Sequence, residues 1–240
     1  MPGQTRLTTS HHMHVHVITM DDGKVNAMSP DMLRDLHSAF DAAEEDDTVK
    51  VVLLTSAARV FSAGFDMSVF AASPEGSLEM LQLGARMTEK ILGFPKPVVT
   101  ACSGHAYPMG AFLMLAADLR LGADGDYRIG MNEVAINMTL PRFAIEIARQ
   151  RLTPAAFNTF LMTGEMLPPQ EAAIAGFIDR VLPADGFADK ALEAAIRLTE
   201  INTGCHRASK QKARATALAA LREAIDAELT PNNFASAFTA

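Results

Sequence analysis

The stretch VKVVLLTS, Val49 to Ser56, decides the fold class of this chain. It is an almost uninterrupted apolar run, which is typical of a strand that is covered on both faces. A second such run, PVVTACSG, extends from Pro97 to Gly104. Each run leads into a turn that contains glycine and then into a sequence of helical character. This alternation predicts an α/β domain with buried, mostly parallel strands.

The N-terminal stretch HMHVHVITM, residues 12–20, alternates between apolar residues and histidines. Alternation predicts a strand with His12, His14 and His16 on one face. Three histidines can bind a metal, but no carboxylate or cysteine is spaced to complete a site. We therefore expect a solvent-exposed strand face and no metal.

Helical segments surround the predicted strands. MSPDMLRDLHSAFDAAEED predicts a helix capped by Ser29, with Pro30 in its first turn. AASPEGS, residues 71–77, predicts a loop before a helix over about residues 78–92. After Pro141 the composition is helical, with segments separated by Gly or Pro. We expect an α/β core over residues 1–185 and a helical region over residues 186–240.

Composition restricts the functional classes. The 240 residues are 49% hydrophobic, enough for one sizeable core. The net charge of -7, without a block of like charges, argues against a nucleic-acid partner. Cys102 and Cys205 make no disulfide framework and lie in no zinc-binding spacing. The polar N-terminus lacks a secretory apolar segment, and the longest apolar run, Ala111 to Ala117, is too short for a membrane span. We expect a cytoplasmic protein without a membrane partner.

Two loops that follow the strands could present backbone N–H groups to a ligand. In FSAGFDM, Ala63 and Gly64 are small, so a ligand could approach the backbone and the N–H of Phe65 would point outward. In the second loop Pro108 has no N–H, so the first donors at the start of the next helix belong to Met109 and Gly110. Two converging N–H groups can hold a thioester oxygen as it becomes an enolate. Either loop alone is also common as a tight turn.

A single carboxylate, Glu133, lies within the apolar stretch GMNEVAINMTLP, Gly130 to Pro141. Burying a charge among apolar side chains is costly. Glu133 therefore either faces solvent from a surface turn or is buried because its proton chemistry is needed. The two preceding loops favour the second interpretation.

Taken in order, these motifs resemble the crotonase superfamily, also called the enoyl-CoA hydratase/isomerase family. The resemblance runs from DDGKVNAMSPDML to GEMLPPQEAAIAGFIDRVLP and covers nearly the whole chain. It implies a spiral of ββα units, a C-terminal helical region used in trimer assembly, and a bent acyl-CoA thioester as substrate. It also implies that the N–H groups of Phe65 and Met109 form the oxyanion hole. No cofactor beyond the CoA of the substrate is implied, and a homotrimer, or a hexamer made as a dimer of trimers, is expected.

The chain departs from the pattern of the hydratases, which carry two catalytic glutamates. The first position falls here on Phe112 and the second on Glu133, and the usual glycine triplet is reduced to Gly110. A single glutamate looks more like the Δ3,Δ2-enoyl-CoA isomerase branch. Moving a double bond from C3=C4 to C2=C3 needs one proton-carrying group, whereas hydration needs a water held and deprotonated as well. The resemblance therefore implies an isomerase that uses Glu133 alone.

Further residues are candidates for contact with the substrate. Asn137 and Asp66 could touch it, although a turn-capping role is simpler for both. Asp118 is expected to make a structural hydrogen bond, and Tyr107 either lines the pocket or packs as a ring. The basic stretch HRASKQKAR could reach the CoA phosphates or form a solvated helix face, and Arg59 is a second candidate. The full substrate-binding set comprises Ala63, Gly64, Asp66, Gly110, Phe112, Asn137, Lys210 and Lys212.

Two other functions stay open. A hydratase acting on 2-enoyl-CoA could use Glu133 with a water held by the backbone or by Asn137. A non-catalytic acyl-CoA binder or an RNA-binding relative belongs to a different class. The acidic net charge and the lack of interleaved basic and aromatic residues count against RNA.

Overall fold

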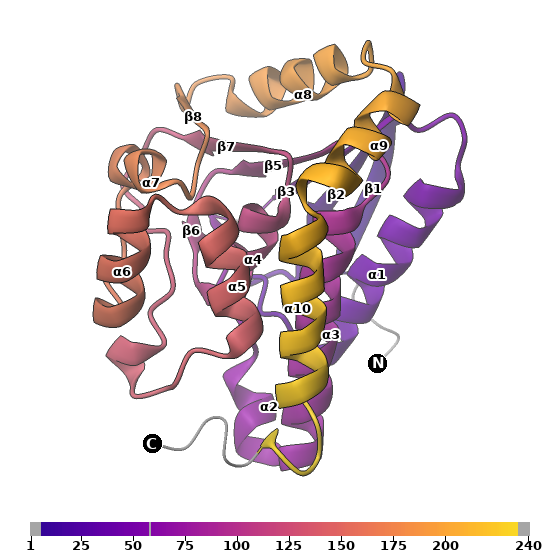
Figure 1. Cartoon of the computed structure of the whole chain (residues 1–240). Coiled ribbons are helices and arrows are strands. Elements are labelled where there is room, and N and C mark those ends of the chain that lie inside the picture. Colours follow the sequence, from indigo (N-terminus) through magenta and orange to yellow (C-terminus); the bar gives the residue numbers. More distant parts are fainter. Residues whose placement is uncertain (1–5, 58, 235–240) are drawn as a thin grey trace.

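The computed structural model describes residues 6–57 and 59–234 of the chain. Its main sheet has six strands in the order β1-β2-β3-β5-β7-β8 (Figure 1). β1 and β2 are antiparallel, and every other neighbouring pair is parallel, which confirms the predicted α/β class. The strands are β1 Leu7–His12, β2 Val15–Met20, β3 Val51–Ser56, β5 Val98–Cys102, β7 Leu119–Ala123 and β8 Arg180–Leu182.

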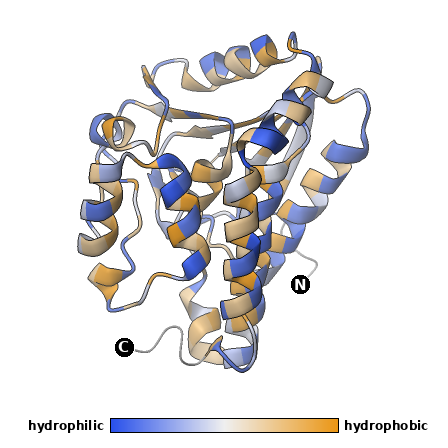
Figure 2. Ribbon diagram, in the orientation of Figure 1, coloured by the Kyte–Doolittle hydropathy of each residue, from blue (hydrophilic) through white to orange (hydrophobic). Residues whose placement is uncertain are grey.

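Both faces of this sheet are covered by helices, as the apolar strands predict. Val51 and Leu53 of β3 pack with one face of α8, Phe187–Leu198, which crosses the sheet in Figure 1. Val52 and Leu54 point to the other face, where the larger core lies. Helices α1 and α8 carry both hydrophilic and hydrophobic residues along their length (Figure 2), as amphipathic helices on a sheet do.

The remaining helices surround the larger core. α10 lies beside α3 in Figure 1 and contacts both α3 and α5. The predicted boundary near residue 185 falls between β8 and α8, and the helices after it share cores with the preceding residues. The helices are α1 Pro30–Glu45, α2 Met67–Ala72, α3 Pro74–Gly93, α4 Pro108–Ala116, α5 Arg142–Arg151, α6 Pro154–Thr163, α7 Pro169–Ala175, α9 Thr203–Ala213 and α10 Ala215–Glu228, with a short 3-10 helix, η1, at Val134–Ile136.

Two short strands outside the main sheet position the loops of interest. β4, Val60–Ser62, pairs in parallel with β6, His105–Ala106. Ala106 in turn bridges Ile129, and Ile129 bridges Leu167. The segment that carries Glu133 therefore starts beside the two glycine-containing loops.

The N-terminal histidine stretch differs from the prediction. The predicted strand over residues 12–20 is interrupted. His12 is the last residue of β1, Met13 turns the chain with a left-handed φ of 56°, and β2 begins at Val15 and runs antiparallel to β1. His16 is buried, with its Nδ1 3.0 Å from His11 Nε2. The expected solvent-exposed histidine face is therefore wrong for His16. Among residues 6–57 and 59–234, no group of three or more potential ligands could hold a metal.

The predicted loop at residues 71–77 is also wrong. α2 ends at Ala72, and α3 begins at Pro74. Ser73 separates them and accepts a hydrogen bond on its Oγ from the N–H of Gly76 at 2.9 Å. The Ser-Pro pair is thus a helix N-cap followed by proline in the first turn, rather than a turn signal. The same signature at Ser29 and Pro30 was identified correctly.

None of the helices in the described part of the chain has the length and apolar character of a membrane span.

Candidate active site

Pairing of β4 with β6 brings the two glycine-containing loops side by side. The N–H of Tyr107 donates to the carbonyl of Ser62 at 2.9 Å, and the hydroxyl of Ser62 accepts from the N–H of Gly64 at 3.1 Å. Gly64 has a φ of 88°, a conformation that L side chains rarely adopt. A Cβ at this position would lie 3.6 Å from Pro108 Cδ. The two loops are therefore in contact at the point where both present their backbone.

The N–H groups of Phe65 and Met109 are without acceptors among the described residues. Met28 is hydrogen-bonded to the residues on either side of Phe65: its N–H donates to the Gly64 carbonyl at 2.8 Å, and its carbonyl accepts from the Asp66 N–H. The Phe65 N–H takes no part in this pairing. Met109 lies in the first turn of α4, where N–H groups have no partner inside the helix. Tyr107, the N-cap, makes no side-chain cap. Phe65 is half-buried, whereas Met109 is fully buried, so contact of the Met109 N–H with a ligand stays a prediction.

The side chains of Phe65 and Met109 both approach α3 at Gly84. A Cβ at Gly84 would lie 2.6 Å from Phe65 Cε1 and 3.0 Å from Met109 Sδ. Because the first distance is shorter than any ordinary contact, a larger residue would displace the Phe65 ring. Gly84 thus allows Phe65 and Met109 to approach α3 together.

With the acyl-CoA thioester that the resemblance implies as substrate, we expect Gly84→Ala to lower kcat/KM by on the order of tenfold, because displacement of Phe65 would shift its N–H away from the expected position of the thioester oxygen. Gly93→Ala in the same helix is the matched control, since its added Cβ would meet only Leu218 at an ordinary 3.5 Å. Steady-state kinetics of both variants check this. Equal kinetics would show that Gly84 has no influence on the site.

Glu133 is buried, which decides between its two predicted environments. It lies at the start of η1, it is only 6% exposed, and its Oε2 has no hydrogen-bond partner within residues 6–57 and 59–234. Burial raises the pKa of Glu133 to about 7, partly offset by a hydrogen bond with its own backbone. A carboxyl group with this pKa exchanges protons readily near neutral pH.

A cavity of about 130 Å³ joins Glu133 to both loops. Its lining is largely apolar, and Glu133 is the one carboxyl group among the described lining residues. This surrounding explains why its pKa is raised. The lining residues are Ala63, Gly64, Phe65, Met67, Phe70, Leu81, Tyr107, Pro108, Asn132, Glu133, Ile136, Met138, Thr139 and Pro141.

Several predicted substrate-binding residues do not line this cavity. Asp66 caps α2 by accepting from the N–H of Ser68 at 2.9 Å, as the simpler interpretation expected. Asn137 ends η1 with a left-handed φ of 61° and is exposed, so the turn role is correct and substrate contact is not supported. Gly110 serves close packing instead, because a Cβ there would lie 2.9 Å from Ser62 Cβ.

Phe112 is fully buried and away from the cavity lining. Its ring packs edge-to-face on Phe143 of α5, with the ring centroids 5.4 Å apart. The expectation that Phe112 contacts substrate is therefore not supported by this arrangement. Burial of the Phe112 ring in the apolar core between α4 and α5 is favourable, and the local sequence does not indicate that this contact forms.

Lys210 was wrong as a contact for the CoA phosphates. Its ammonium group forms a 2.7 Å ion pair with Asp118 and donates to the Ile91 carbonyl at 3.3 Å, and the residue is only 6% exposed. Burial lowers the pKa of Lys210 to about 8. Asp118 also accepts from the N–H of Val98 at 2.8 Å, which confirms its structural role. Lys212 is exposed, so its contact with CoA stays a prediction.

Sequence reasoning missed much of the apolar lining. Leu81 comes from α3, while Met67 and Phe70 come from α2. Their helical spacing indicates amphipathic helices, but not which apolar residues turn toward a cavity rather than the core.

The chain matches known proteins over most of its length. The family model "Enoyl-CoA hydratase/isomerase" matches residues 10–239. A solved enoyl-CoA hydratase from Mycobacterium ulcerans is 41% identical, covers 92% of this chain and 96% of its own, and superposes with a TM-score of 0.86. Two solved structures from Mycobacterium tuberculosis are each 40% identical and cover 92% of this chain: one is described as a probable enoyl-CoA hydratase, with 93% of its own chain covered and a TM-score of 0.88, and the other as an enoyl-CoA isomerase, with 96% covered and a TM-score of 0.86. A carnitinyl-CoA dehydratase of Citrobacter koseri is 30% identical over 210 residues, which cover 85% of this chain and 78% of that protein.

Proposed function

Since this chain belongs to the enoyl-CoA hydratase/isomerase family, we propose that it moves the C3=C4 double bond of a 3-enoyl-CoA to C2=C3. The observation that carries this proposal is the single carboxyl group of the cavity, Glu133, buried opposite two loops with free N–H groups. In this arrangement one acid faces one set of oxyanion donors.

The reaction needs only these groups. The carboxylate of Glu133 removes a proton from C2, the electron pair of that C–H bond forms a C1=C2 double bond, and the carbonyl pair moves onto the thioester oxygen while C3=C4 stays in place. The oxygen of this dienolate carries the negative charge, and the N–H groups of Phe65 and Met109 hold it. Glu133 then returns the proton to C4: the oxygen pair restores the carbonyl, the C1=C2 pair becomes the C2=C3 double bond, and the C3=C4 pair binds the proton. A pKa of about 7 suits a group that must first accept and then donate a proton.

The apolar lining supports isomerisation over hydration. Hydration needs a water molecule held and deprotonated next to C3, and Glu133 is the one carboxyl group among the described lining residues. Family hydratases use a second glutamate at the position of Phe112, which in this chain packs in the core. An apolar cavity excludes water and so protects the dienolate from side reactions.

A hydratase remains the second candidate. It is favoured by the hydratase and dehydratase names of the relatives and by Asn132, a polar side chain in the cavity lining that could hold a water. Asn132 takes the place of Asn137, which lies outside the cavity lining.

Comparing two substrates separates these functions. We expect trans-3-hexenoyl-CoA to be isomerised with a kcat/KM on the order of 100 times that for hydration of trans-2-butenoyl-CoA, since one catalytic group is missing for hydration. Product analysis by mass spectrometry distinguishes the two, because hydration adds the mass of water and isomerisation adds none. Faster hydration than isomerisation would favour the second candidate.

The remaining partners follow from the family and are proposals for this chain. Family members bind acyl-CoA, so the CoA moiety is proposed as part of the substrate and no separate cofactor is invoked. A homotrimer, or a dimer of trimers, is proposed, with Lys212 as the remaining candidate for contact with the CoA phosphates. Analytical ultracentrifugation tests the assembly. A cytoplasmic location stays a prediction.

A further inference from the structure

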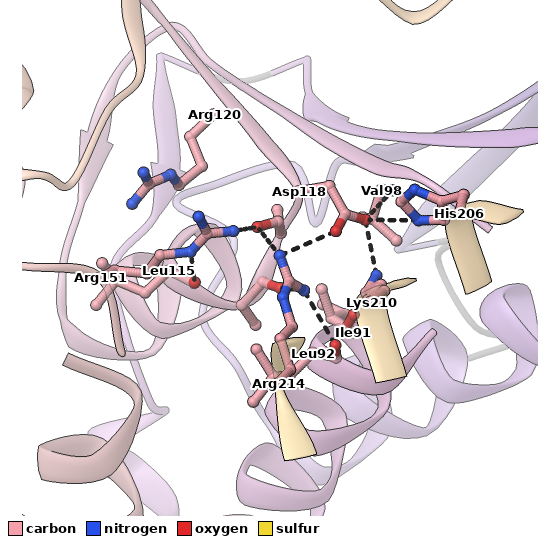
Figure 3. Close-up of polar contacts among 12 residues, drawn as sticks. Ile91, Leu92, Val98, Leu115, Asp118, Arg120, Arg151, His206, Lys210 and Arg214 are labelled. Carbon is pink, nitrogen blue, oxygen red and sulfur yellow. Dashed lines mark hydrogen bonds and ion pairs between the residues drawn. The ribbon is translucent and has the colours of Figure 1, made fainter. Parts of the chain in front are cut away.

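A cluster of basic side chains lies at the C-terminal end of α4 (Figure 3), and its residues are not among those that line the cavity. Four of them, Arg151, His206, Lys210 and Arg214, surround this helix end and Asp118. Ala116, the last residue of α4, lies seven residues after Met109, so the cluster is about 10 Å along the helix axis from the Met109 N–H. Its contacts nevertheless hold the whole helix.

Two guanidinium groups take up the carbonyl oxygens at this end of α4. Arg151 donates through Nε to the Leu115 carbonyl at 3.2 Å and through Nη2 to the Ala117 carbonyl. Arg214 donates to the Ala116 carbonyl at 3.2 Å and to the Ala117 carbonyl at 3.3 Å. The last carbonyls of a helix have no partner inside it, so these side chains supply the missing donors at three consecutive residues.

Arg214 also connects α4 to other elements. Its Nη1 donates to the carbonyl of Leu92 at 3.0 Å, near the C-terminal end of α3. Its Nη2 forms a 2.9 Å ion pair with Asp118, which in turn accepts from Val98 of the sheet. Arg214 therefore holds α4 in a constant position relative to the sheet and to α3, the helix that carries Gly84.

We propose that Arg151 and Arg214 are positioning residues for the oxyanion hole: they hold the C-terminal end of α4 so that the Met109 N–H keeps its direction. This inference rests on the proposed role of the Phe65 and Met109 amides. A nine-residue helix moves as a rigid unit, so a small tilt at one end displaces a donor at the other. The two guanidinium charges also lie at the C-terminal, negative end of the α4 dipole, where cations are stabilising. The positive end of the same dipole, at the Met109 N–H, favours a negatively charged ligand.

The chain offers a matched control in Arg120. It is buried to a similar degree, with 4% exposure against 8% for Arg214. It likewise pairs with an aspartate, Asp179, and donates to a helix-end carbonyl, that of Gly176 after α7. Its hydrogen bonds do not involve α4. Substitution of Arg120 should therefore reduce stability without disturbing the oxyanion donors.

The test uses Arg151→Lys, Arg214→Lys and Arg120→Lys in the full chain, with acetoacetyl-CoA as probe. The enolate of this thioester absorbs in the near ultraviolet, so its fraction on the protein as a function of pH reports how well the oxyanion hole holds negative charge. We expect Arg151→Lys and Arg214→Lys to lower enolate affinity and kcat by on the order of tenfold, with little change in KM. Arg120→Lys is expected to lower the melting temperature similarly but to keep enolate affinity and kcat.

Arg151→Lys is the decisive variant, because within the described residues the side-chain hydrogen bonds of Arg151 go only to Leu115 of α4 and to its C-cap, Ala117. This variant tests the proposal even if Arg214→Lys fails to fold. Enolate affinity equal to that of Arg120→Lys would overturn the proposal and leave the cluster a purely structural one. A wild-type protein that binds no enolate would remove the oxyanion hole and this inference together. A wild-type protein that binds the enolate but does not isomerise 3-enoyl-CoA would remove only the proposed reaction.

Discussion

Glu133→Gln is expected to lower turnover of an enoyl-CoA by a factor on the order of 10²–10⁴, the usual contribution of general acid–base catalysis. The substitution keeps the shape of the side chain and removes the group that carries the proton. The substitution does not alter the proposed contacts of the thioester with the N–H groups of Phe65 and Met109, so binding should persist. We therefore expect a fall in kcat with little change in the dissociation constant.

Two measurements check this expectation. Initial rates with a 3-enoyl-CoA give kcat, and calorimetry with a saturated acyl-CoA gives binding without turnover. Glu165→Gln is the control, because it makes the same chemical change at an exposed glutamate. Unchanged turnover in Glu133→Gln would mean that another base acts, or that the protein only binds acyl-CoA.

Although Glu133→Gln should lower turnover, it should raise the free energy of unfolding relative to the wild type, by an amount that increases with pH. The pKa of Glu133 is raised from 4.5 to about 7 by burial, so the folded state disfavours the ionised form more than the unfolded state does. The stability that the protonated carboxyl contributes is fully present below the unfolded pKa and is lost as pH rises through 7. Glutamine cannot ionise and loses nothing over this range.

Between about pH 5 and pH 8 the free energy of unfolding of the wild type should therefore fall by about 2–3 kcal/mol relative to Glu133→Gln. Denaturant unfolding of both proteins at the two pH values measures the difference. Glu165→Gln, at an exposed position, should follow the wild type at both. Parallel behaviour of wild type and Glu133→Gln would show that Glu133 is ionised in the folded protein at little cost.

Together the two expectations describe one compromise. A carboxyl group buried in an apolar cavity, with its Oε2 unpaired among the described residues, destabilises the fold at neutral pH, and the same environment gives it a pKa suited to proton transfer. The buried environment of Glu133 could be inferred from the sequence because two recognisable loops precede it; the apolar residues that follow it were no guide, since Val134 and Ile136 are exposed. Its orphaned Oε2 and its place in the cavity lining needed the coordinates.

Local patterns were sufficient for much of the fold. The apolar runs of β3 and β5 predicted buried parallel strands, and Ser29 with Pro30 predicted the start of α1. These features depend on residues a few positions apart, so a short stretch of sequence is enough to predict them. The error at Ser73 arose because the same Ser-Pro pair also occurs in turns, and only the N–H of Gly76 shows which is present.

The α/β class, the order of the motifs and the chemical groups available to the site could thus be predicted from the sequence alone. Which groups meet became clear only from the packing of the folded chain: Lys210 contacts Asp118 rather than a phosphate, Phe112 contacts Phe143, and Phe65 and Met109 both approach Gly84. The physical reason is that these contacts join residues far apart in the chain. They depend on how strands pair and helices pack, and no local pattern records that geometry.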